Sequence, residues 1–151
     1  MIYLVDEDLS DVEVYSDIFR EEGYETRIIE DADEAYDVLV GATNVQGIIL
    51  DVMLATGVSQ TSRFDSIETN NYTQTGLALA KRLKLAHTES GRPPNYSRII
   101  LFSNATENGF LSSIKETVDD LKISYFAKYD ETDPFDIASK MLRVIQGWEA
   151  Q

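Results

Sequence analysis

The sequence predicts a doubly wound α/β domain, in which helices cover both faces of a five-stranded parallel sheet. Three observations predict it. Short apolar runs alternate with helical patterns along the chain, these runs lack the strict apolar–polar alternation of a half-buried strand, and 151 residues is the size of one domain. A chain of this length buries ~68–70% of its unfolded surface, so it needs no cross-links, and it contains no cysteine.

The predicted strands are short runs rich in β-branched and aromatic residues. In chain order they are Ile2–Val5, Thr26–Ile29, Gly47–Leu50, Arg98–Phe102 and Ile123–Ala127. Continuous runs of this kind are typical of strands that are buried on both faces of a sheet.

The predicted helices are stretches in which apolar residues recur at three- and four-residue steps. Their apolar stripes begin in turn at Leu9, Ala32, Leu77, Phe110 and Phe135. Gly23 follows the first stripe as a stop signal. Asp133 and Pro134 have the residue types favoured at the N-cap and the first position of the last helix.

The composition excludes several classes of function. Thirteen Lys and Arg against twenty-seven Asp and Glu give a net charge of −14. This charge repels phosphate backbones and anionic lipid, so we expect no direct nucleic-acid or membrane partner. No run reaches the ~18 apolar residues of a membrane span, and Asp6 comes too early for a signal peptide. With no cysteine, these features predict a cytoplasmic protein.

Polar residues stand at the ends of four predicted strands. Asp6 and Glu7 end the first strand and Asp51 ends the third, while Ser103 and Lys128 end the fourth and fifth. In an open parallel sheet with the flavodoxin-like order 2-1-3-4-5, ligands bind outside the carboxyl ends of the strands, where the strand order reverses. We therefore expect these five side chains to converge on one site.

The residue types in this set indicate phosphoryl transfer. Three carboxylates at close range repel one another unless a cation joins them. Oxygen ligands without His or Cys suit Mg²⁺, which also accepts phosphate oxygens. A hydroxyl and an ammonium can hold the remaining phosphoryl oxygens while a carboxylate acts as the nucleophile.

Four segments at these strand ends resemble the response-regulator receiver domain of two-component signalling. Leu4–Asp8 resembles the acidic pair of that family, and Ile48–Leu54 resembles its phosphoacceptor strand. Ile99–Ala105 is similar to the strand that ends in the switch Ser or Thr, and Tyr125–Lys128 to the strand with an aromatic residue before the lysine. The order and spacing of the four segments carry the resemblance.

The resemblance implies a role for each matching residue. Asp51 would be the phosphoacceptor, taking its phosphoryl group from a sensor histidine kinase or a histidine phosphotransfer protein in a phosphorelay. Ser103 and Lys128 would bind phosphoryl oxygens, and Ser103 with Tyr125 would act as the switch. Mg²⁺ would be the cofactor, held by Asp6, Glu7, Asp51 and the backbone carbonyl of Met53.

The resemblance also implies how the phosphoprotein would signal. Output would occur through protein–protein contacts on the face made by the fourth helix, fifth strand and fifth helix. The chain would not be a classical enzyme, since it would catalyse only its own phosphorylation and dephosphorylation. A stand-alone response regulator and a fragment of a longer one would have the same sequence here.

One segment departs from the family pattern. We expect residues 1–151 to form a single receiver domain with an insertion at roughly 55–75, between the third strand and the third helix. From Leu54 to Thr75, twelve of twenty-two residues are Ser, Thr, Asn or Gln. The insertion would restrict access to the site or select partners, with Phe64, Ile67 and Tyr72 as anchors. The alternative is a solvated loop with no role.

Two other functions remain open from the sequence. One is a Mg²⁺-dependent phosphohydrolase of haloacid-dehalogenase type that uses Asp6 and Asp8, although this interpretation leaves Asp51 without a role. The other is a pseudo-receiver that only binds partners and has no phosphoacceptor chemistry.

Overall fold

A computed structural model describes most of the chain. The described residues are 1–54, 62–70, 73–104, 108–128 and 133–151, and for 108–110 only the backbone is described. The predicted anchor Tyr72 lies outside these residues.

Five strands and five α-helices alternate along the chain. The strands are β1 (Ile2–Val5), β2 (Thr26–Ile29), β3 (Gly47–Leu50), β4 (Ile99–Ser103) and β5 (Ser124–Ala127). The α-helices are α1 (Leu9–Glu21), α2 (Ala32–Leu39), α3 (Thr75–Ser90), α4 (Asn108–Leu121) and α5 (Pro134–Glu149), and a short 3₁₀ helix, η1 (Asn95–Arg98), precedes β4.

The strands form one parallel sheet in the order β2-β1-β3-β4-β5. This confirms the predicted fold class and strand order. The prediction that every strand is buried on both faces is wrong for the two edge strands: β1, β3 and β4 are fully buried, whereas β2 and β5 are partly exposed. The reason is positional, because each edge strand has a neighbour on one side only.

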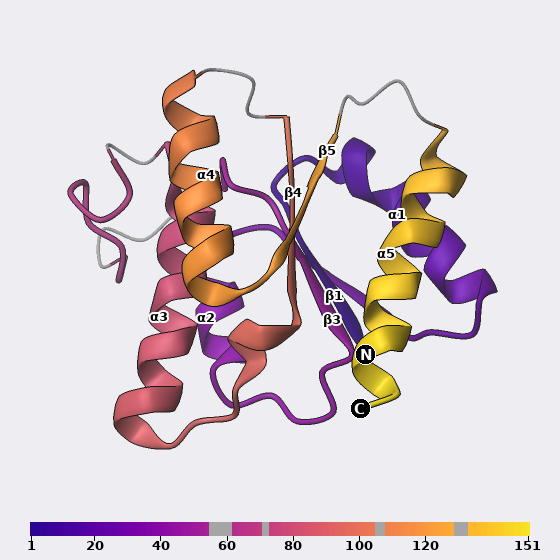
Figure 1. The fold of residues 1–151 in the computed structure, drawn as a ribbon, viewed down its shortest axis with the longest axis horizontal. Helices are drawn as coiled ribbons and strands as arrows, with labels where there is room; N and C mark the ends of the chain where they lie inside the picture. The colour runs from indigo at the N-terminus through magenta and orange to yellow at the C-terminus, as the bar shows by residue number, and fades with distance from the viewer. Residues whose placement is uncertain (55–61, 71–72, 105–107, 129–132) are drawn as a thin grey trace.

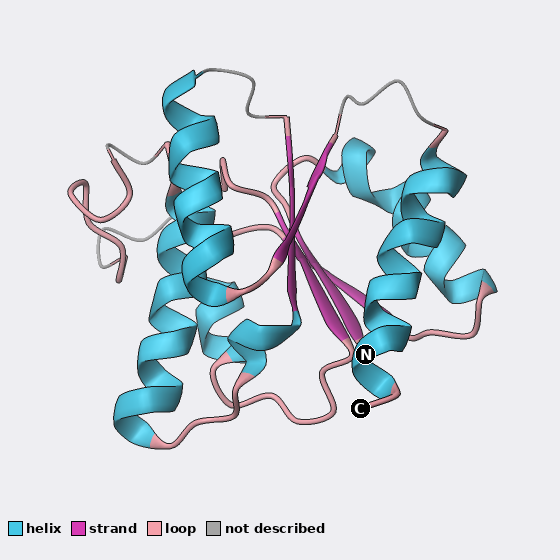
Figure 2. Cartoon of the chain, viewed as in Figure 1, coloured by secondary structure: helices cyan, strands magenta, loops and turns pink. Residues whose placement is uncertain are grey.

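Helices cover both faces of the sheet (Figures 1 and 2). Helices α1 and α5 lie on one face, and α2, α3 and α4 lie on the other. Alternate residues of β1 divide between these layers: Ile2 and Leu4 belong to the apolar cluster under α1 and α5, and Tyr3 and Val5 to the cluster under the other three helices. This alternation explains why the strand sequence is apolar without interruption.

Aspartate side chains begin three of the helices. Asp8 accepts the N–H of Ser10 at the start of α1, and Asp31 accepts the N–H of Glu34 at the start of α2. Asp133 caps α5, and Pro134 lies in the first turn of this helix, as predicted. Of the helices in the described part of the chain, none combines the length and the apolar character that a membrane-spanning segment needs.

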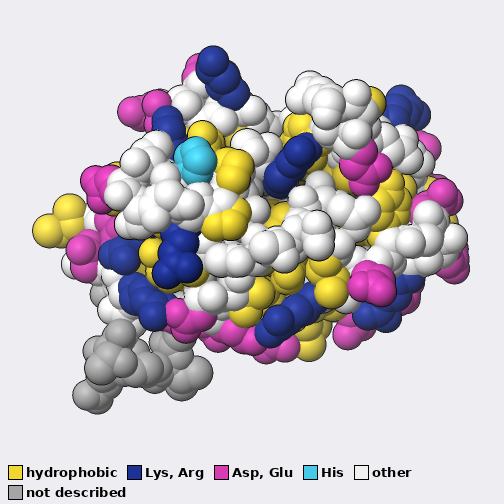
Figure 3. Space-filling model, turned by 90° about the horizontal axis from the view of Figure 1, so that it is seen from below, with side chains coloured by type: hydrophobic (Ala, Val, Ile, Leu, Met, Phe, Trp, Pro, Cys, Tyr) yellow, Lys and Arg dark blue, Asp and Glu magenta, His cyan; other side chains and the backbone are white. Residues whose placement is uncertain are grey.

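The amino ends of the strands lie at the lower edge of the sheet in Figure 1, near both chain termini. There the Met1 ammonium donates to Gln46 Oε1 at 2.6 Å, and Gln46 Nε2 donates to Glu149 at 3.2 Å. The buried Asn95 amide donates to the carbonyls of Leu39 and Ala42 at 2.6 and 3.0 Å. Seen from below, this end of the molecule carries charged side chains of both signs among apolar ones (Figure 3).

The described part of the predicted insertion, residues 62–70, packs against α2 and α3. Phe64 is buried and confirms its predicted role as an anchor, but Ile67 is 91% exposed, so the prediction that Ile67 is an anchor is wrong. Polar groups hold the segment instead, because Ser62 Oγ and the N–H of Arg63 both donate to the Asp33 carboxylate, at 2.8 and 2.9 Å.

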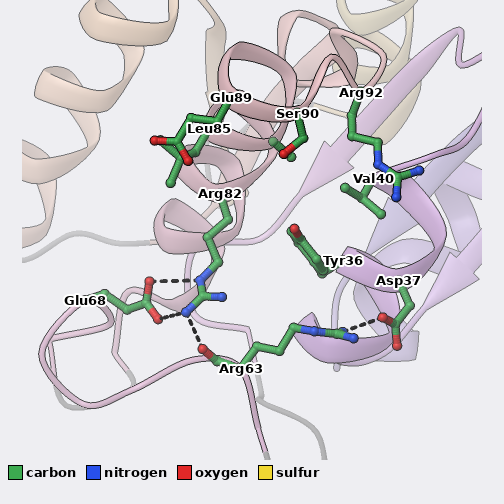
Figure 4. Close-up of a pocket in the computed structure, with 11 residues that line it drawn as sticks. Tyr36, Asp37, Val40, Arg63, Glu68, Arg82, Leu85, Glu89, Ser90 and Arg92 are labelled. Atoms are coloured by element: carbon green, nitrogen blue, oxygen red, sulfur yellow. Dashed lines mark hydrogen bonds and ion pairs between the residues drawn. The ribbon is translucent and has the colours of Figure 1, made fainter.

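Two arginines hold the 62–70 segment from opposite sides (Figure 4). Arg63 pairs with Asp37 of α2, and Arg82 of α3 pairs with Glu68 at 2.6 Å and donates to the Arg63 carbonyl. A hollow of about 710 Å³ lies between these groups around Tyr36. None of its lining residues is one of the five predicted at the carboxyl ends of the strands.

Candidate functional site at the carboxyl ends of the strands

Backbone hydrogen bonds hold the residues that follow the strands in register with their neighbours. The N–H of Asp6 donates to the Ile29 carbonyl at 2.9 Å, and the N–H of Asp51 donates to the Val5 carbonyl at 3.0 Å. The N–H of Lys128 likewise donates to the Ser103 carbonyl at 2.9 Å. The hydrogen-bond ladder therefore continues one residue beyond β1, β3 and β5 and fixes the backbone positions of Asp6, Asp51 and Lys128.

The Lys128 ammonium is the centre of the site. Its Nζ lies 2.6 Å from Asp6 Oδ2, 3.2 Å from Asp11 Oδ2 and 3.5 Å from Asp51 Oδ2. The side chains of Lys128 and Asp6 are only 7% and 2% exposed, so water screens this contact weakly. The structure thus brings together three of the five predicted site residues through one buried cation.

Burial makes Asp6 a weak acid. The pKa of Asp6 rises to about 6, first because burial disfavours its charged form and second because of the nearby Asp51 charge. Hydrogen bonds from Lys128 and from the Asp8 N–H partly oppose this rise. Asp6 is therefore a site where positive charge is strongly favoured.

The same carboxylates also shift the pKa of Lys128. Burial by itself lowers the pKa of an ammonium, but the charges and hydrogen bonds of Asp51 and Asp6 outweigh that effect. The pKa of Lys128 consequently lies above its ordinary value, and the side chain stays charged at neutral pH.

Ser103, predicted to bind a phosphoryl oxygen, ends β4 fully buried. Within the described part of the chain its Oγ has no hydrogen-bond partner. A buried hydroxyl without a partner costs about 1–3 kcal/mol. Its backbone carbonyl, in contrast, accepts from the Tyr125 hydroxyl at 3.3 Å, which links the two predicted switch residues.

Tyr125 is half-buried and packs against the apolar cluster under α2, α3 and α4. Burial raises the pKa of its phenol. Its hydroxyl therefore stays protonated at neutral pH and can donate to Ser103.

Two contributors to the site were not predicted from the sequence. Asp11 faces Lys128 from the first turn of α1, and nothing in its local sequence distinguishes it from other surface acids. Gly76 brings the start of α3 against β3: its N–H donates to the Val52 carbonyl at 2.9 Å, and a Cβ there would lie 1.9 Å from the Asp51 carbonyl oxygen. Only glycine fits this approach.

No family model matches the sequence, and no curated protein matches it significantly. Solved structures do match. A CheY-like response regulator receiver domain protein from Methanospirillum hungatei JF-1 has a TM-score of 0.65 and 17% identity, with 99% of this chain and 95% of that chain covered.

Two further structures agree. The signal receiver domain of a signal transduction histidine kinase from Syntrophus aciditrophicus has a TM-score of 0.66 and 22% identity, covering 97% of this chain and 89% of that chain. The receiver domain of NtrX from Brucella abortus has a TM-score of 0.62 and 21% identity, covering 97% of this chain and 95% of that chain. The chain has the receiver-domain fold.

The predicted magnesium ligands of this receiver fold are only partly gathered. Asp6 and Asp51 converge, but Glu7, where the chain bends toward α1, is exposed. Met53 donates its N–H to Asp51 Oδ1 at 3.3 Å, and its side chain is 43% exposed. Among the residues whose placement is described, no three Asp, Glu, His or Cys side chains are grouped to hold a metal ion.

The pair Asp6 and Asp51 nevertheless fits a hard divalent cation. Mg²⁺ keeps several of its waters and is commonly bound through one or two carboxylates together with phosphate oxygens. The pKa of Asp6 is raised first by burial and second by the charge of Asp51, and a cation beside these carboxylates would oppose both effects. In the structure Lys128 meets part of this need for positive charge through its contacts with both carboxylates.

Asp8 has a different role from the one that a phosphohydrolase would require. It is exposed, and its carboxylate accepts the N–H and the hydroxyl of Ser10, at 3.1 and 2.6 Å. These bonds cap α1 and lower the pKa of Asp8. Asp8 is therefore engaged in starting a helix rather than in the buried cluster.

Proposed function

We propose that this chain is a phosphoacceptor receiver that takes a phosphoryl group on Asp51 and signals by contacts with other proteins. The observation that carries the proposal is the cluster at the carboxyl ends of the strands: the Asp51 carboxylate lies 3.5 Å from a buried ammonium, which also pairs with Asp6. The receiver fold supports it, and so does the buried Ser103 hydroxyl, which has no hydrogen-bond partner in the part of the chain that is described.

In the proposed reaction an Asp51 carboxylate oxygen attacks the phosphorus of a phosphohistidine on a sensor kinase or phosphotransfer protein. The new bond is P–O, the P–N bond breaks, and the imidazole leaves with its electron pair and takes a proton. Lys128 neutralises the charge that the arriving phosphoryl oxygens bring. The Ser103 hydroxyl donates to one of those oxygens and so gains a partner that the described residues do not provide.

Mg²⁺ is the cofactor of this proposal. When bound, it would neutralise charge between the carboxylates and the phosphoryl oxygens. Asp6 and Asp51 are the residues of this chain that would hold it, and Glu7 and the Met53 carbonyl remain candidates for the other positions. The chain's own contribution is to bury Asp6 beside Asp51, so that a cation is favoured there in addition to Lys128.

Acetyl phosphate tests the proposal without the natural donor. With Mg²⁺ present, we expect the protein to gain one phosphoryl group by mass and lose it at high pH, while Asp51→Asn gains none. Beryllofluoride with Mg²⁺ should attach to Asp51, whereas a phosphohydrolase of the alternative class would carry it on Asp6. Equal labelling of Asp51→Asn would refute the proposal, and Asp65→Asn, which changes an exposed acid, is the control.

The proposed signal runs from Ser103 to Tyr125. A phosphoryl group would draw the Ser103 hydroxyl toward Asp51 and so alter the end of β4, to which the Tyr125 hydroxyl donates. The face of α4, β5 and α5 would then bind the downstream protein.

The substitution Ser103→Ala should have opposite effects on stability and on signalling. Because the Ser103 hydroxyl is buried with no hydrogen-bond partner among the described residues, its removal should raise the free energy of unfolding by about 1 kcal/mol. The same change should abolish the amide NMR shifts that beryllofluoride causes in β5.

A matched control is Ser16→Ala, because Ser16 is also buried but shares a 2.7 Å hydrogen bond with Thr26 Oγ1. The free energy of unfolding of this control should fall. A loss of stability in Ser103→Ala as large as that in Ser16→Ala would contradict the account of Ser103.

A further inference from the structure

Asp11 competes for the cation on which the proposed reaction depends. The Lys128 ammonium has three N–H donors, and it makes hydrogen bonds to two carboxylates, Asp6 at 2.6 Å and Asp11 at 3.2 Å. Asp51 lies farther away, at 3.5 Å. The ammonium is therefore held toward α1, the helix that carries Asp11, rather than toward the phosphoacceptor.

Asp11 has a larger effect on the position of Lys128 when Asp6 binds another cation. Lys128 then keeps two anionic neighbours, Asp11 and Asp51, and the hydrogen bond to Asp11 is the one already formed. Asp11 is 26% exposed and belongs to the first turn of a helix, so it can hold the ammonium without being buried itself. An ammonium held there is less available to oxygens that arrive at Asp51.

We propose that Asp11 is a positioning residue that restrains Lys128 on the α1 side of the site and thereby slows phosphorylation of Asp51. This inference rests on the proposed phosphoacceptor function. In the reaction with acetyl phosphate, an Asp51 oxygen forms the new P–O bond and the P–O bond to the acetyl group breaks, releasing acetate with the electron pair. Lys128 faces the phosphoryl oxygens during this exchange only when it leaves Asp11.

The test measures the rate of Asp51 labelling by acetyl phosphate at saturating Mg²⁺. Asp11→Asn should be labelled about two- to fivefold faster than the natural protein, as expected for the loss of a partly exposed ion pair. Asp11→Glu, which keeps the charge, should retain the slow rate. Asp17→Asn makes the same charge change at an exposed position of α1 and should leave the rate unchanged.

A double-mutant cycle without metal supplies a second measurement. With EDTA present, Asp11→Asn should lower the urea midpoint of unfolding when Lys128 is present, and change it less in a Lys128→Met background. A role of Asp11 confined to the charge at the start of α1 would give the same change in both backgrounds.

The outcomes separate the inference from the function on which it rests. If Asp51 is labelled but Asp11→Asn reacts at the natural rate or more slowly, the restraint by Asp11 is wrong and the receiver function stands. Equal acceleration in Asp11→Glu would also overturn the restraint. If the natural protein gains no phosphoryl group on Asp51, both the proposed function and the inference fail.

Discussion

Replacement of Gly76 by alanine should lower the free energy of unfolding by about 3 kcal/mol, at the upper end of what overpacking usually costs. The added Cβ would lie 1.9 Å from the Asp51 carbonyl oxygen and 2.9 Å from Val52 Cα, and both are backbone atoms. Neither can turn aside as the end of a flexible side chain would. Either α3 moves away from β3, or the backbone that presents the Asp51 carboxylate is displaced.

Urea unfolding followed by circular dichroism measures this effect. Gly147→Ala is the matched control, because Gly147 lies in α5 and a Cβ there would meet nothing within 4 Å. The control should gain about 0.5–1 kcal/mol, since alanine is the better helix former. If both variants gained stability, the close approach of α3 to β3 would be wrong.

Replacement of Lys128 by methionine should cost about 3–5 kcal/mol at pH 7.5 without divalent cations, the range measured when a buried ion pair loses one partner. Methionine keeps most of the aliphatic volume but leaves Asp6 and Asp51 buried without their cation. Lys140→Met, which changes an exposed lysine of α5, should cost little.

The cost of Lys128→Met should shrink as the pH falls. The pKa of Asp6 is raised from 3.8 to about 6 in the folded protein, so the folded state binds the proton more tightly than the unfolded chain does. This contribution to stability is complete below pH ~3.8 and is lost as the pH rises through about 6. Lys128 lowers the pKa of Asp6, so the removal of Lys128 raises that pKa further. In Lys128→Met the stability gained from protonating Asp6 is therefore lost at a higher pH than in the natural protein.

Unfolding curves at pH 7.5 and pH 5 should therefore show a smaller difference between Lys128→Met and the natural protein at pH 5. Lys140→Met carries the same change in net charge, which accounts for the general effect of acid on a chain of charge −14. A difference that stays constant or grows at pH 5 would contradict the raised pKa of Asp6.

The fold could be predicted because its signals are local. Apolar runs located every strand to within about one residue, and Asp133 with Pro134 marked the start of α5 correctly. The convergence of Asp6, Asp51 and Lys128 followed from topology, since parallel strands end at one edge.

What could not be predicted depends on how elements meet in space. Asp11 joins the site because the first turn of α1 lies within hydrogen-bond reach of Lys128, which follows β5, and Gly76 matters because α3 touches the end of β3. Ile67 is apolar in sequence yet exposed, whereas Phe64, three residues earlier, is buried. The roles of Asp11 and Gly76 come from contacts between residues that are distant in the sequence, and the exposure of Ile67 depends on how the 62–70 segment packs against its neighbours.

Lys128 also has a consequence for how the cluster meets its surroundings. Because it is covalently tethered beside Asp6 and Asp51, its effective concentration there is constant, whatever the solution contains. The lysine acts as a built-in counter-ion, which supplies one positive charge to the two carboxylates independently of dissolved salt. A dissolved cation that enters must exchange with this tethered one, and its apparent affinity is reduced by the free energy of the contacts that Lys128 gives up.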